Sequence, residues 1–214
     1  MLKASIDLGT NTCLLLIAEV ESGCVNMVLG DYARIIRLGE GVDKTRYLQP
    51  EAIERTLKCL DEYRKIISTA GILPGDVICV ATSQARDAEN GSEFFARVEA
   101  DLGFVFRVVS GKDEARLSFK GSLLPNMEAS NHAVVDIGGG STEFVTVNGG
   151  LSTDLGSVRF TERYLKSDPI TDEEFSICLK EIDNKLEKLV DWRSVTPSDM
   201  QMLAVAGTAT TLAS

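Results

Sequence analysis

Two glycine-rich turns, each preceded by an aspartate, are the residues of this sequence best suited to phosphate chemistry. Asp7 leads into residues 9–12 (GTNT), and Asp136 leads into residues 138–142 (GGGST). Glycine-rich turns can direct several backbone N–H groups at one anion, and Thr and Ser hydroxyls add further donors. The aspartates would repel a phosphate directly, but they could hold a hydrated Mg²⁺ that faces the phosphate oxygens.

Each turn taken alone could also be an ordinary hairpin turn in which Asp and Thr cap the strands. The two turns support each other, because aligning the two aspartates also places Gly9 on Gly138 and Thr12 on Ser141. The sequence therefore predicts a divergent internal duplication with one phosphate-binding turn in each half.

Alternating apolar patterns and helical periods surround the two turns. In the first half we expect strands at 4–8, 12–20, 24–36, 77–81 and 104–109, helices at 50–70, 92–102 and 111–123, and a polar loop at 82–90. In the second half we expect strands at 133–137, 141–147 and 200–206, a hairpin turn at 148–150, helices at 158–165 and 171–190, and a further helix from Gly207. The spacing Thr171-x-x-Glu174 predicts a capping box at the start of the helix 171–190.

Composition and charge narrow the classes of partner. The formal charge is −10, and no basic stripe is visible that could release counterions from a nucleic acid duplex. No apolar stretch approaches the roughly 20 residues that span a bilayer. The five cysteines are scattered without a C-x-x-C spacing, which indicates reduced core thiols in a cytoplasmic protein.

The two turns, taken with three further blocks, resemble the exopolyphosphatase/guanosine pentaphosphate phosphohydrolase (Ppx/GppA) family of the actin–hexokinase–Hsp70 superfold. The further blocks are residues 81–90 (ATSQARDAEN), 110–117 (SGKDEARL) and 207–213 (GTATTLA). Residues 155–159 (LGSVR) also match the family's pattern. The blocks occur in order over the whole chain, which makes the resemblance specific.

The resemblance implies an α/β fold made of two ribonuclease H-like (actin-like ATPase) half-domains, each a mixed sheet with helices, with a cleft between them. We expect the first domain over 1–125 and the second over 126–214, where Pro, Asn and Ser cluster at the boundary. Family members usually continue after the third motif, so the second domain is expected to be truncated at its C-terminus. Its uncovered apolar surface makes a homodimer plausible.

The resemblance also assigns roles to single residues. Glu114 is the expected general base, although an acid in the first turn of a helix is also favoured by the helix dipole. Arg86 is the expected phosphate-binding arginine, although it could be a surface arginine at a helix start. Glu143 is expected in the cleft as a metal ligand or second acid. The full expected set is catalytic Glu114 and Arg86; phosphate-binding Gly9, Thr10, Asn11, Thr12, Gly138, Gly139, Gly140, Ser141, Thr142, Gly207 and Thr208; and metal-binding Asp7, Asp136 and Glu143.

The implied activity is release of terminal phosphate from inorganic polyphosphate or from guanosine penta- or tetraphosphate, with water attacking in line and Mg²⁺ or Mn²⁺ bound. The sequence has a single histidine, His132, which argues against a Ser-His-acid triad, and His132 is expected to be structural. Two alternatives remain at this point: a kinase of the same superfold, and a sensor that binds nucleotide or polyphosphate without turnover.

Overall fold

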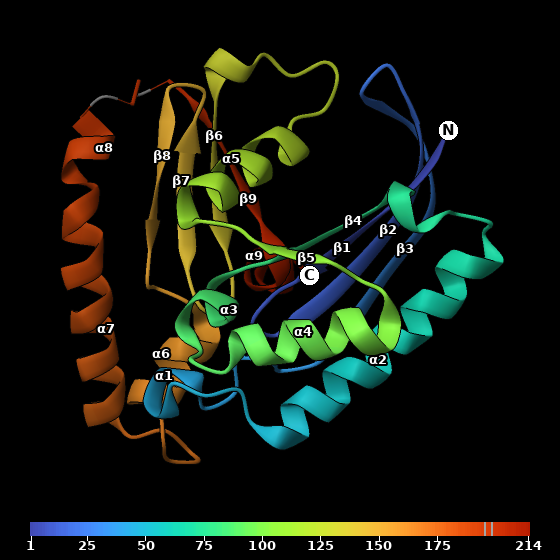
Figure 1. Ribbon diagram of the computed structural model, residues 1–214. Helices are drawn as coiled ribbons and strands as arrows, with labels where there is room; N and C mark the ends of the chain where they lie inside the picture. Colours follow the sequence, from blue (N-terminus) through green and yellow to red (C-terminus); the bar gives the residue numbers. More distant parts are fainter. Residues whose placement is uncertain (195, 198) are drawn as a thin grey trace. The chain divides into compact units, whose positions relative to one another are not determined.

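The computed structural model describes residues 1–194, 196–197 and 199–214 (Figure 1). The chain divides into two compact units, Met1–Val109 and Ser110–Ser214. Each unit has its own sheet and its own core, and the two are described in turn.

The first unit contains a five-stranded mixed sheet in the order β3-β2-β1-β4-β5. Its strands are β1 (Leu2–Leu8), β2 (Thr12–Glu21), β3 (Cys24–Ile35), β4 (Val77–Ala81) and β5 (Phe106–Val108). β1, β2 and β3 form an antiparallel meander, whereas β4 and β5 run parallel to β1. The tight β2–β3 turn uses Ser22 and Gly23 with φ of 52° and 80°, the left-handed values that a two-residue hairpin requires.

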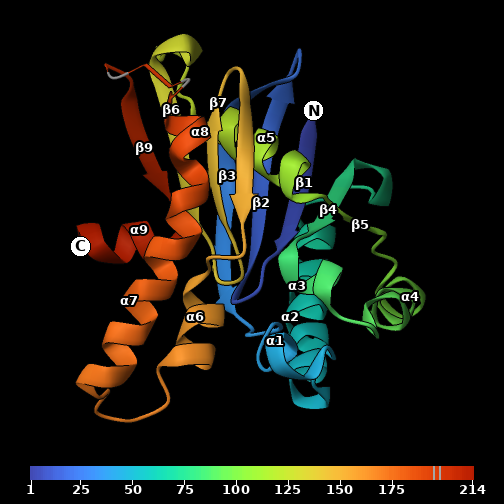
Figure 2. The same cartoon turned by 90° about the vertical axis from the view of Figure 1, so that its left-hand side faces the viewer.

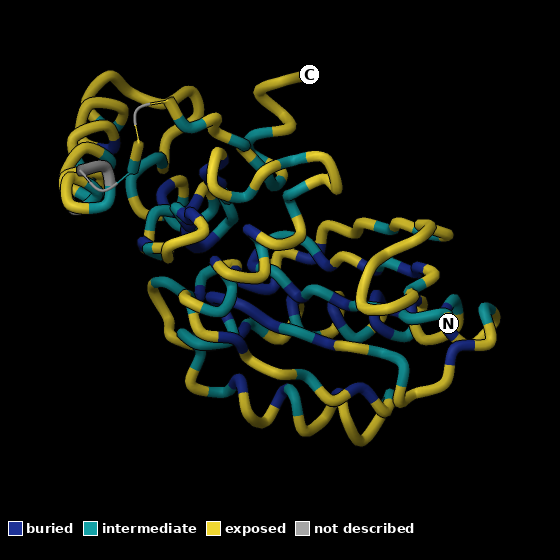
Figure 3. Tube along the Cα trace, turned by 90° about the horizontal axis from the view of Figure 1, so that it is seen from above, coloured by how far each residue is buried: buried dark blue, intermediate teal, exposed yellow. Residues whose placement is uncertain are grey.

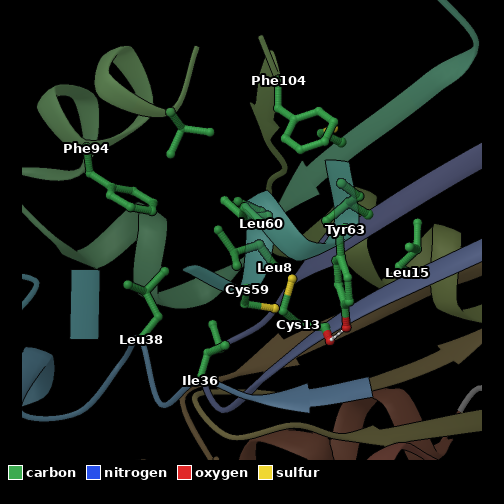
Figure 4. Close-up of a cluster of buried hydrophobic side chains, with 14 of the residues drawn as sticks. Leu8, Cys13, Leu15, Ile36, Leu38, Cys59, Leu60, Tyr63, Phe94 and Phe104 are labelled. Carbon is green, nitrogen blue, oxygen red and sulfur yellow. Dashed lines mark hydrogen bonds between the residues drawn. The ribbon is translucent and has the colours of Figure 1, made fainter. Parts of the chain in front are cut away.

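Two helices of the first unit follow the predicted helical periods, and three short helical elements were not predicted. They are α1 (Val42–Thr45), α2 (Pro50–Thr69), the 3-10 turn η1 (Pro74–Asp76), α3 (Ser83–Asp87) and α4 (Gly91–Leu102). Helix α2 begins with Pro50 at its first turn, where no backbone donor is lost. Its apolar face packs Leu60 and Tyr63 against Leu8 and Leu15 of the sheet, and the Tyr63 hydroxyl donates to the Cys13 carbonyl over 2.9 Å (Figure 4).

The second unit repeats this topology in a four-stranded sheet ordered β8-β7-β6-β9. Its strands are β6 (His132–Ile137), β7 (Thr142–Thr146), β8 (Gly149–Thr153) and β9 (Gln201–Val205). β6, β7 and β8 are antiparallel and β9 runs parallel to β6, as β4 does to β1. Asp7 and Asp136 occupy the same place in the two sheets, which confirms that the chain contains an internal duplication.

The helices of the second unit are α5 (Gly111–Ser122), η2 (Ala129–Asn131), α6 (Ser157–Tyr164), α7 (Asp172–Leu186), η3 (Glu187–Leu189), α8 (Val190–Ser194) and α9 (Ala206–Ala213). Figure 2 shows α7 continuing into α8, so the single helix expected over 171–190 is a helical run with a tighter turn inside it. The predicted capping box is present: the Thr171 side chain accepts from the Glu174 N–H over 3.2 Å, and Glu174 accepts from the Thr171 N–H over 3.1 Å.

Helix α5 belongs to the second unit. Its buried residues Ala115 and Phe119 pack with Val134 and Val145 of the second sheet. The division between the units therefore falls after Val109, earlier than the boundary at 125/126 that the turn-forming residues suggested. The stretch of Pro, Asn and Ser residues around 124–131 is a connection inside the second unit, because the apolar face of α5 has its partners in β6 and β7.

The mixed α/β fold class is confirmed, and two local expectations are wrong. The polar loop expected at 82–90 contains α3, and the turn expected at 148–150 lies earlier, because β8 already begins at Gly149. The cleft between the halves stays a prediction. Figure 3 shows buried chain along the central strands of each unit and an exposed terminal helix, α9, in which no residue is buried. Among the described residues no helix is both long enough and apolar enough to cross a membrane.

Candidate phosphate and acid site

The first glycine turn (residues 9–12) is closed by its own backbone and tied to the segment after β3. The Gly9 N–H donates to the Thr12 carbonyl over 2.9 Å, and an added Cβ at Gly9 would lie only 3.0 Å from that oxygen. The Gly39 N–H donates to the Thr10 carbonyl over 2.9 Å, and the N–H groups of Ile36 and Arg37 share the Asn11 carbonyl. The carbonyls of the turn are therefore satisfied inside the protein.

The second glycine turn (residues 138–142) has the same construction. The Gly138 N–H donates to the Ser141 carbonyl over 3.0 Å. The carbonyls of Gly138 and Gly139 accept from the N–H groups of residues 157–159 at the start of α6. In a planar peptide the N–H points opposite to the C=O. Holding the carbonyls of a turn in this way directs its N–H groups to the other side, as an anion-binding turn requires.

Three of the hydroxyls expected to bind phosphate are used inside the protein. Thr10 Oγ1 donates to Gln84 Oε1 over 3.1 Å and lies 2.9 Å from Ser83 Oγ, with all three side chains buried. The Thr142 hydroxyl donates to the Leu155 carbonyl. The Ser141 hydroxyl bonds to the carboxylate of Glu143. These three hydroxyls are therefore engaged inside the protein, so phosphate bound at the two turns would be held mainly by backbone N–H groups of the turn residues.

Three acids of the second unit lie within electrostatic reach of one another. Asp136 ends β6 and is paired in register with Glu143 on β7. Glu114 lies in the first turn of α5, and Ser118, one helical turn later, donates to Asp136 Oδ2 over 2.5 Å. The face of α5 that carries Glu114 and Ser118 is thus turned toward the two strands.

Glu143 is a buried acid with a strongly raised pKa. Glu143 is only 1% exposed, and the Ser152 hydroxyl of β8 donates to its Oε1 over 2.7 Å. Burial raises the pKa of Glu143 to about 7, and the negative charges of Glu114 and Asp136 add to the rise, while the bonds from Ser152 and Ser141 oppose it. A buried acid with a strongly shifted pKa beside a glycine turn is typical of a functional site.

The donor chemistry of this site suits Mg²⁺ or Mn²⁺ only as part of a wider ligand set. In the ranges 1–194, 196–197 and 199–214, no three His, Cys, Asp or Glu side chains gather closely enough to hold a metal ion by themselves. Mg²⁺ commonly keeps several waters and uses one or two carboxylates together with phosphate oxygens. Asp136 and Glu143 fit that requirement: burial is the main cause of the raised pKa of Glu143, the charges of Glu114 and Asp136 add to it, and a cation beside the two carboxylates would offset both effects.

The remaining predicted residues lie at the matching strand ends. Asp7 ends β1 and pairs in register with Leu14 and Val80. Arg86 lies on α3 just after β4, where its Nη1 donates to the Val109 carbonyl over 2.8 Å. Gly207 and Thr208 lie in the first turn of α9, which follows β9 directly, and α3 likewise follows β4 in the first unit. His132 starts β6 and contacts the Glu128 carbonyl over 2.7 Å, as a structural histidine does.

Four supporting residues were not identified as site residues from the sequence. Ser118 and Ser152 bond the acids, while Gln84 and Arg159 bond the glycine turns. Ser118 alone had a local signal, because it lies four residues after Glu114 on one helix face. The contacts of Ser152 depend on strand pairing, and those of Gln84 and Arg159 depend on how α3 and α6 pack, which single positions do not reveal.

Known proteins of one family resemble the chain over nearly its whole length. The model of the Ppx/GppA phosphatase family matches residues 16–214. An exopolyphosphatase 2 of Mycobacterium tuberculosis is 41% identical over 98% of the chain and 69% of its own length. A bifunctional 3-dehydroquinate synthase/phosphatase of Fusobacterium nucleatum is 40% identical over 98% of the chain. The chain spans only 33% of that Fusobacterium protein.

Solved structures agree with these relatives. A crystal structure of an exopolyphosphatase-like protein matches with a TM-score of 0.89 and 36% identity, covering 99% of the chain and 67% of that protein. A Ppx/GppA family member from Aquifex aeolicus matches with a TM-score of 0.72 and 36% identity, and the match covers 100% of the chain and 68% of the Aquifex protein. The two glycine turns, the acids beside the second turn and these likenesses agree: the chain belongs to the Ppx/GppA phosphatase family.

Proposed function

We propose that this chain carries phosphate-releasing hydrolase machinery that acts on the terminal phosphate of inorganic polyphosphate or of guanosine penta- or tetraphosphate. Its family membership supports phosphate release as the reaction class. The choice of substrate rests on relatives that are named exopolyphosphatase and guanosine-5'-triphosphate,3'-diphosphate pyrophosphatase, the latter from Pseudoalteromonas atlantica and 31% identical over 96% of the chain and 43% of its own length.

The observation that carries the proposal is the group of acids beside the second glycine turn. Hydrolysis needs a base for water, and a pure binding protein has no use for one. Glu114 is the proposed base, because it lies on the strand-facing side of α5 and its negative charge contributes to the raised pKa of Glu143. The N–H groups of the two turns and Arg86 are proposed to bind the phosphate oxygens, whose negative charge spreads in the transition state.

A divalent cation is part of the proposal, with Asp136 and Glu143 as ligands in the second unit and Asp7 as the corresponding acid in the first. When bound, Mg²⁺ or Mn²⁺ supplies neutralisation of charge on the phosphate oxygens. A binding measurement tests this independently of turnover. In Mn²⁺ titrations followed by electron paramagnetic resonance with orthophosphate present, Asp136→Asn should weaken binding at least tenfold, and unchanged binding would exclude Asp136 as a ligand.

The decisive assay compares substrates. The chain is incubated with long-chain polyphosphate, guanosine pentaphosphate, or ATP plus glucose, and free phosphate and ADP are measured with Mg²⁺ and with chelator. We expect free phosphate from polyphosphate or the guanosine nucleotide, and loss of release in chelator. ADP formed only with glucose would establish a kinase instead. Binding of polyphosphate without release from any substrate would establish a sensor.

Two further expectations accompany this proposal. All five cysteines are free thiols and four of them are buried, which supports a reducing, cytoplasmic location. The homodimer expected from the sequence stays a prediction, to be checked by the mass of the chain in solution.

A further inference from the structure

The carbonyl groups of both glycine turns are held by the segment that follows the third strand of the same sheet. In the first unit this segment is residues 36–39, after β3, and in the second unit it is residues 155–159, after β8. Each segment contains a glycine packed on the turn: an added Cβ at Gly39 would lie 2.3 Å from Thr10 Cγ2, and one at Gly156 would lie 2.3 Å from the Gly139 carbonyl oxygen. The two segments are equivalent parts of the duplicated fold.

The two segments differ in how they hold the third residue of the turn. In the first turn, two backbone donors, the N–H groups of Ile36 and Arg37, bind the Asn11 carbonyl over 2.9 and 3.0 Å. In the second turn the equivalent residue is Gly140, and the guanidinium Nε of Arg159 donates to its carbonyl over 2.8 Å. A side chain thus takes the place that backbone donors hold in the first unit.

Arg159 also holds the preceding peptide. Its backbone N–H donates to the Gly139 carbonyl over 3.1 Å, so one residue fixes two consecutive carbonyls of the turn. The side-chain bond is charge-assisted, which makes it stronger than a bond between neutral groups. Because the peptide is planar, a fixed Gly140 carbonyl also fixes the direction of the Ser141 N–H.

We propose that Arg159 is a positioning residue for the reaction, which holds the Gly140–Ser141 peptide so that its N–H is presented to the phosphate. This deepens the proposed function, because it assumes that the second glycine turn binds phosphate. Arg159 acts through the turn and not by touching the substrate. Its loss leaves the acids in place but lets the peptide turn away from the phosphate.

The first arm of the test needs no substrate. Backbone ¹⁵N relaxation is measured for Gly140 and Ser141 in the ligand-free chain, in Arg159→Gln, and in the matched control Arg163→Gln, which removes the same charge one turn later on α6. We expect the order parameters of the two amides to fall from the rigid value of ~0.85 toward ~0.6 in Arg159→Gln and to stay unchanged in the control. Arg159→Lys, which keeps the charge but lacks the rigid fork, should be intermediate.

The second arm measures orthophosphate binding by calorimetry and release of phosphate from polyphosphate. We expect Arg159→Gln to weaken orthophosphate binding and to raise KM about tenfold, with a smaller change in kcat. The control Arg163→Gln should keep the orthophosphate affinity and the KM of the unaltered chain. Weaker orthophosphate binding with unchanged order parameters would make Arg159 a direct ligand and overturn the positioning role. Unchanged order parameters together with unchanged orthophosphate binding and KM in Arg159→Gln would also overturn the positioning role.

The two proposals can fail separately. If the unaltered chain releases no phosphate from any substrate, the proposed hydrolase fails, yet the relaxation arm still decides whether Arg159 orders the turn. If Arg159→Gln does not fold, Arg159→Lys carries both measurements, and a rigid turn with unchanged KM in that variant would contradict the proposal.

Discussion

Asp136 and Glu143 lie directly opposite each other on the antiparallel strands β6 and β7. The same register position in the first sheet pairs Asp7 with Leu14 on β1 and β2. Leu14 carries no charge, so only the second unit adds a carboxylate to the aspartate of its glycine turn. The duplicated halves have therefore diverged: both keep the turn, while the second unit carries the cluster of acids.

Glu143 should make stability depend on pH in a metal-free solution. Its pKa is raised from 4.5 to about 7 in the folded chain, chiefly by burial. The protonated form is favoured by folding, so the stability that Glu143 contributes is full below pH ~4.5 and is lost as pH rises through about 7. Above pH 7 this loss amounts to about 3 kcal/mol.

The Glu143→Gln variant tests this dependence, because Gln cannot ionise. Urea denaturation in chelator should show Glu143→Gln gaining stability over the unaltered chain between pH 5 and 8, with little difference at pH 4.5. A difference that is constant over this range would show that Glu143 does not titrate there. Adding Mg²⁺ and phosphate should reduce the difference at pH 8 if the carboxylate binds the ion.

Gly39→Ala should destabilise the first unit, and Thr10→Ser should rescue it. The added Cβ would meet the Thr10 methyl at 2.3 Å, and its next neighbours are Thr10 Cβ at 3.3 Å and Gln84 Cβ at 3.4 Å. Overpacking of this kind costs on the order of 1–3 kcal/mol. Thr10→Ser removes the methyl and keeps the hydroxyl that bonds Gln84, so the double variant should recover most of the lost free energy of unfolding.

Gly156→Ala is the comparison for this rescue. Its added Cβ would lie 2.3 Å from the backbone of Gly139 and Gly140, where no side chain can be shortened to make room. Thermal denaturation should therefore show a destabilisation that Thr10→Ser leaves unchanged. Equal rescue of both glycine variants by Thr10→Ser would contradict the contact assigned to Gly39.

Glu174 should support α7 only while it is ionised. Its carboxylate accepts the N–H groups of Thr171, Lys166 and Ser167, and the Thr171 backbone bond is the main cause of its lowered pKa. A depressed pKa contributes stability above the unfolded-state value, and this contribution is lost as pH falls. Glu174→Gln should thus lower the urea midpoint at pH 7 and have little effect at pH 3.

The neighbouring Glu173→Gln is the control, because it removes the same charge from the same helical turn without breaking the capping box. It should change the midpoint less than Glu174→Gln at pH 7. Equal effects of the two variants would assign the stabilisation to the helix dipole alone.

Much of this fold follows from local patterns in the sequence. The alternating strand β1 before a glycine turn recurs in β6, and Thr171 with Glu174 marks the start of α7 by known chemistry. The topology of both sheets then follows from short connections and strand order. The role of Glu143 came from the family resemblance and not from a local pattern, and its pairing with Asp136 is seen only in the register of β6 and β7.

The parts that local patterns miss are held by contacts across the fold. α3 has no apolar period, and its buried residue Gln84 holds it on the first sheet by donating to the Leu8 carbonyl over 2.8 Å and accepting from Thr10. The glycine-rich start of β8 has a low strand propensity, and it is a strand through its pairing with β7. Ser152 reaches Glu143 only through that pairing, so no single-sequence signal identified it.

Glu114 is proposed to activate water beside the second glycine turn. The most direct test measures phosphate release from long-chain polyphosphate by Glu114→Gln, with Asp113→Asn as the control that removes a neighbouring charge from the same turn of α5. We predict that Glu114→Gln loses about 10²–10⁴-fold in kcat while polyphosphate still binds, and that Asp113→Asn keeps its activity. Full turnover by Glu114→Gln would contradict the role of Glu114 as the general base.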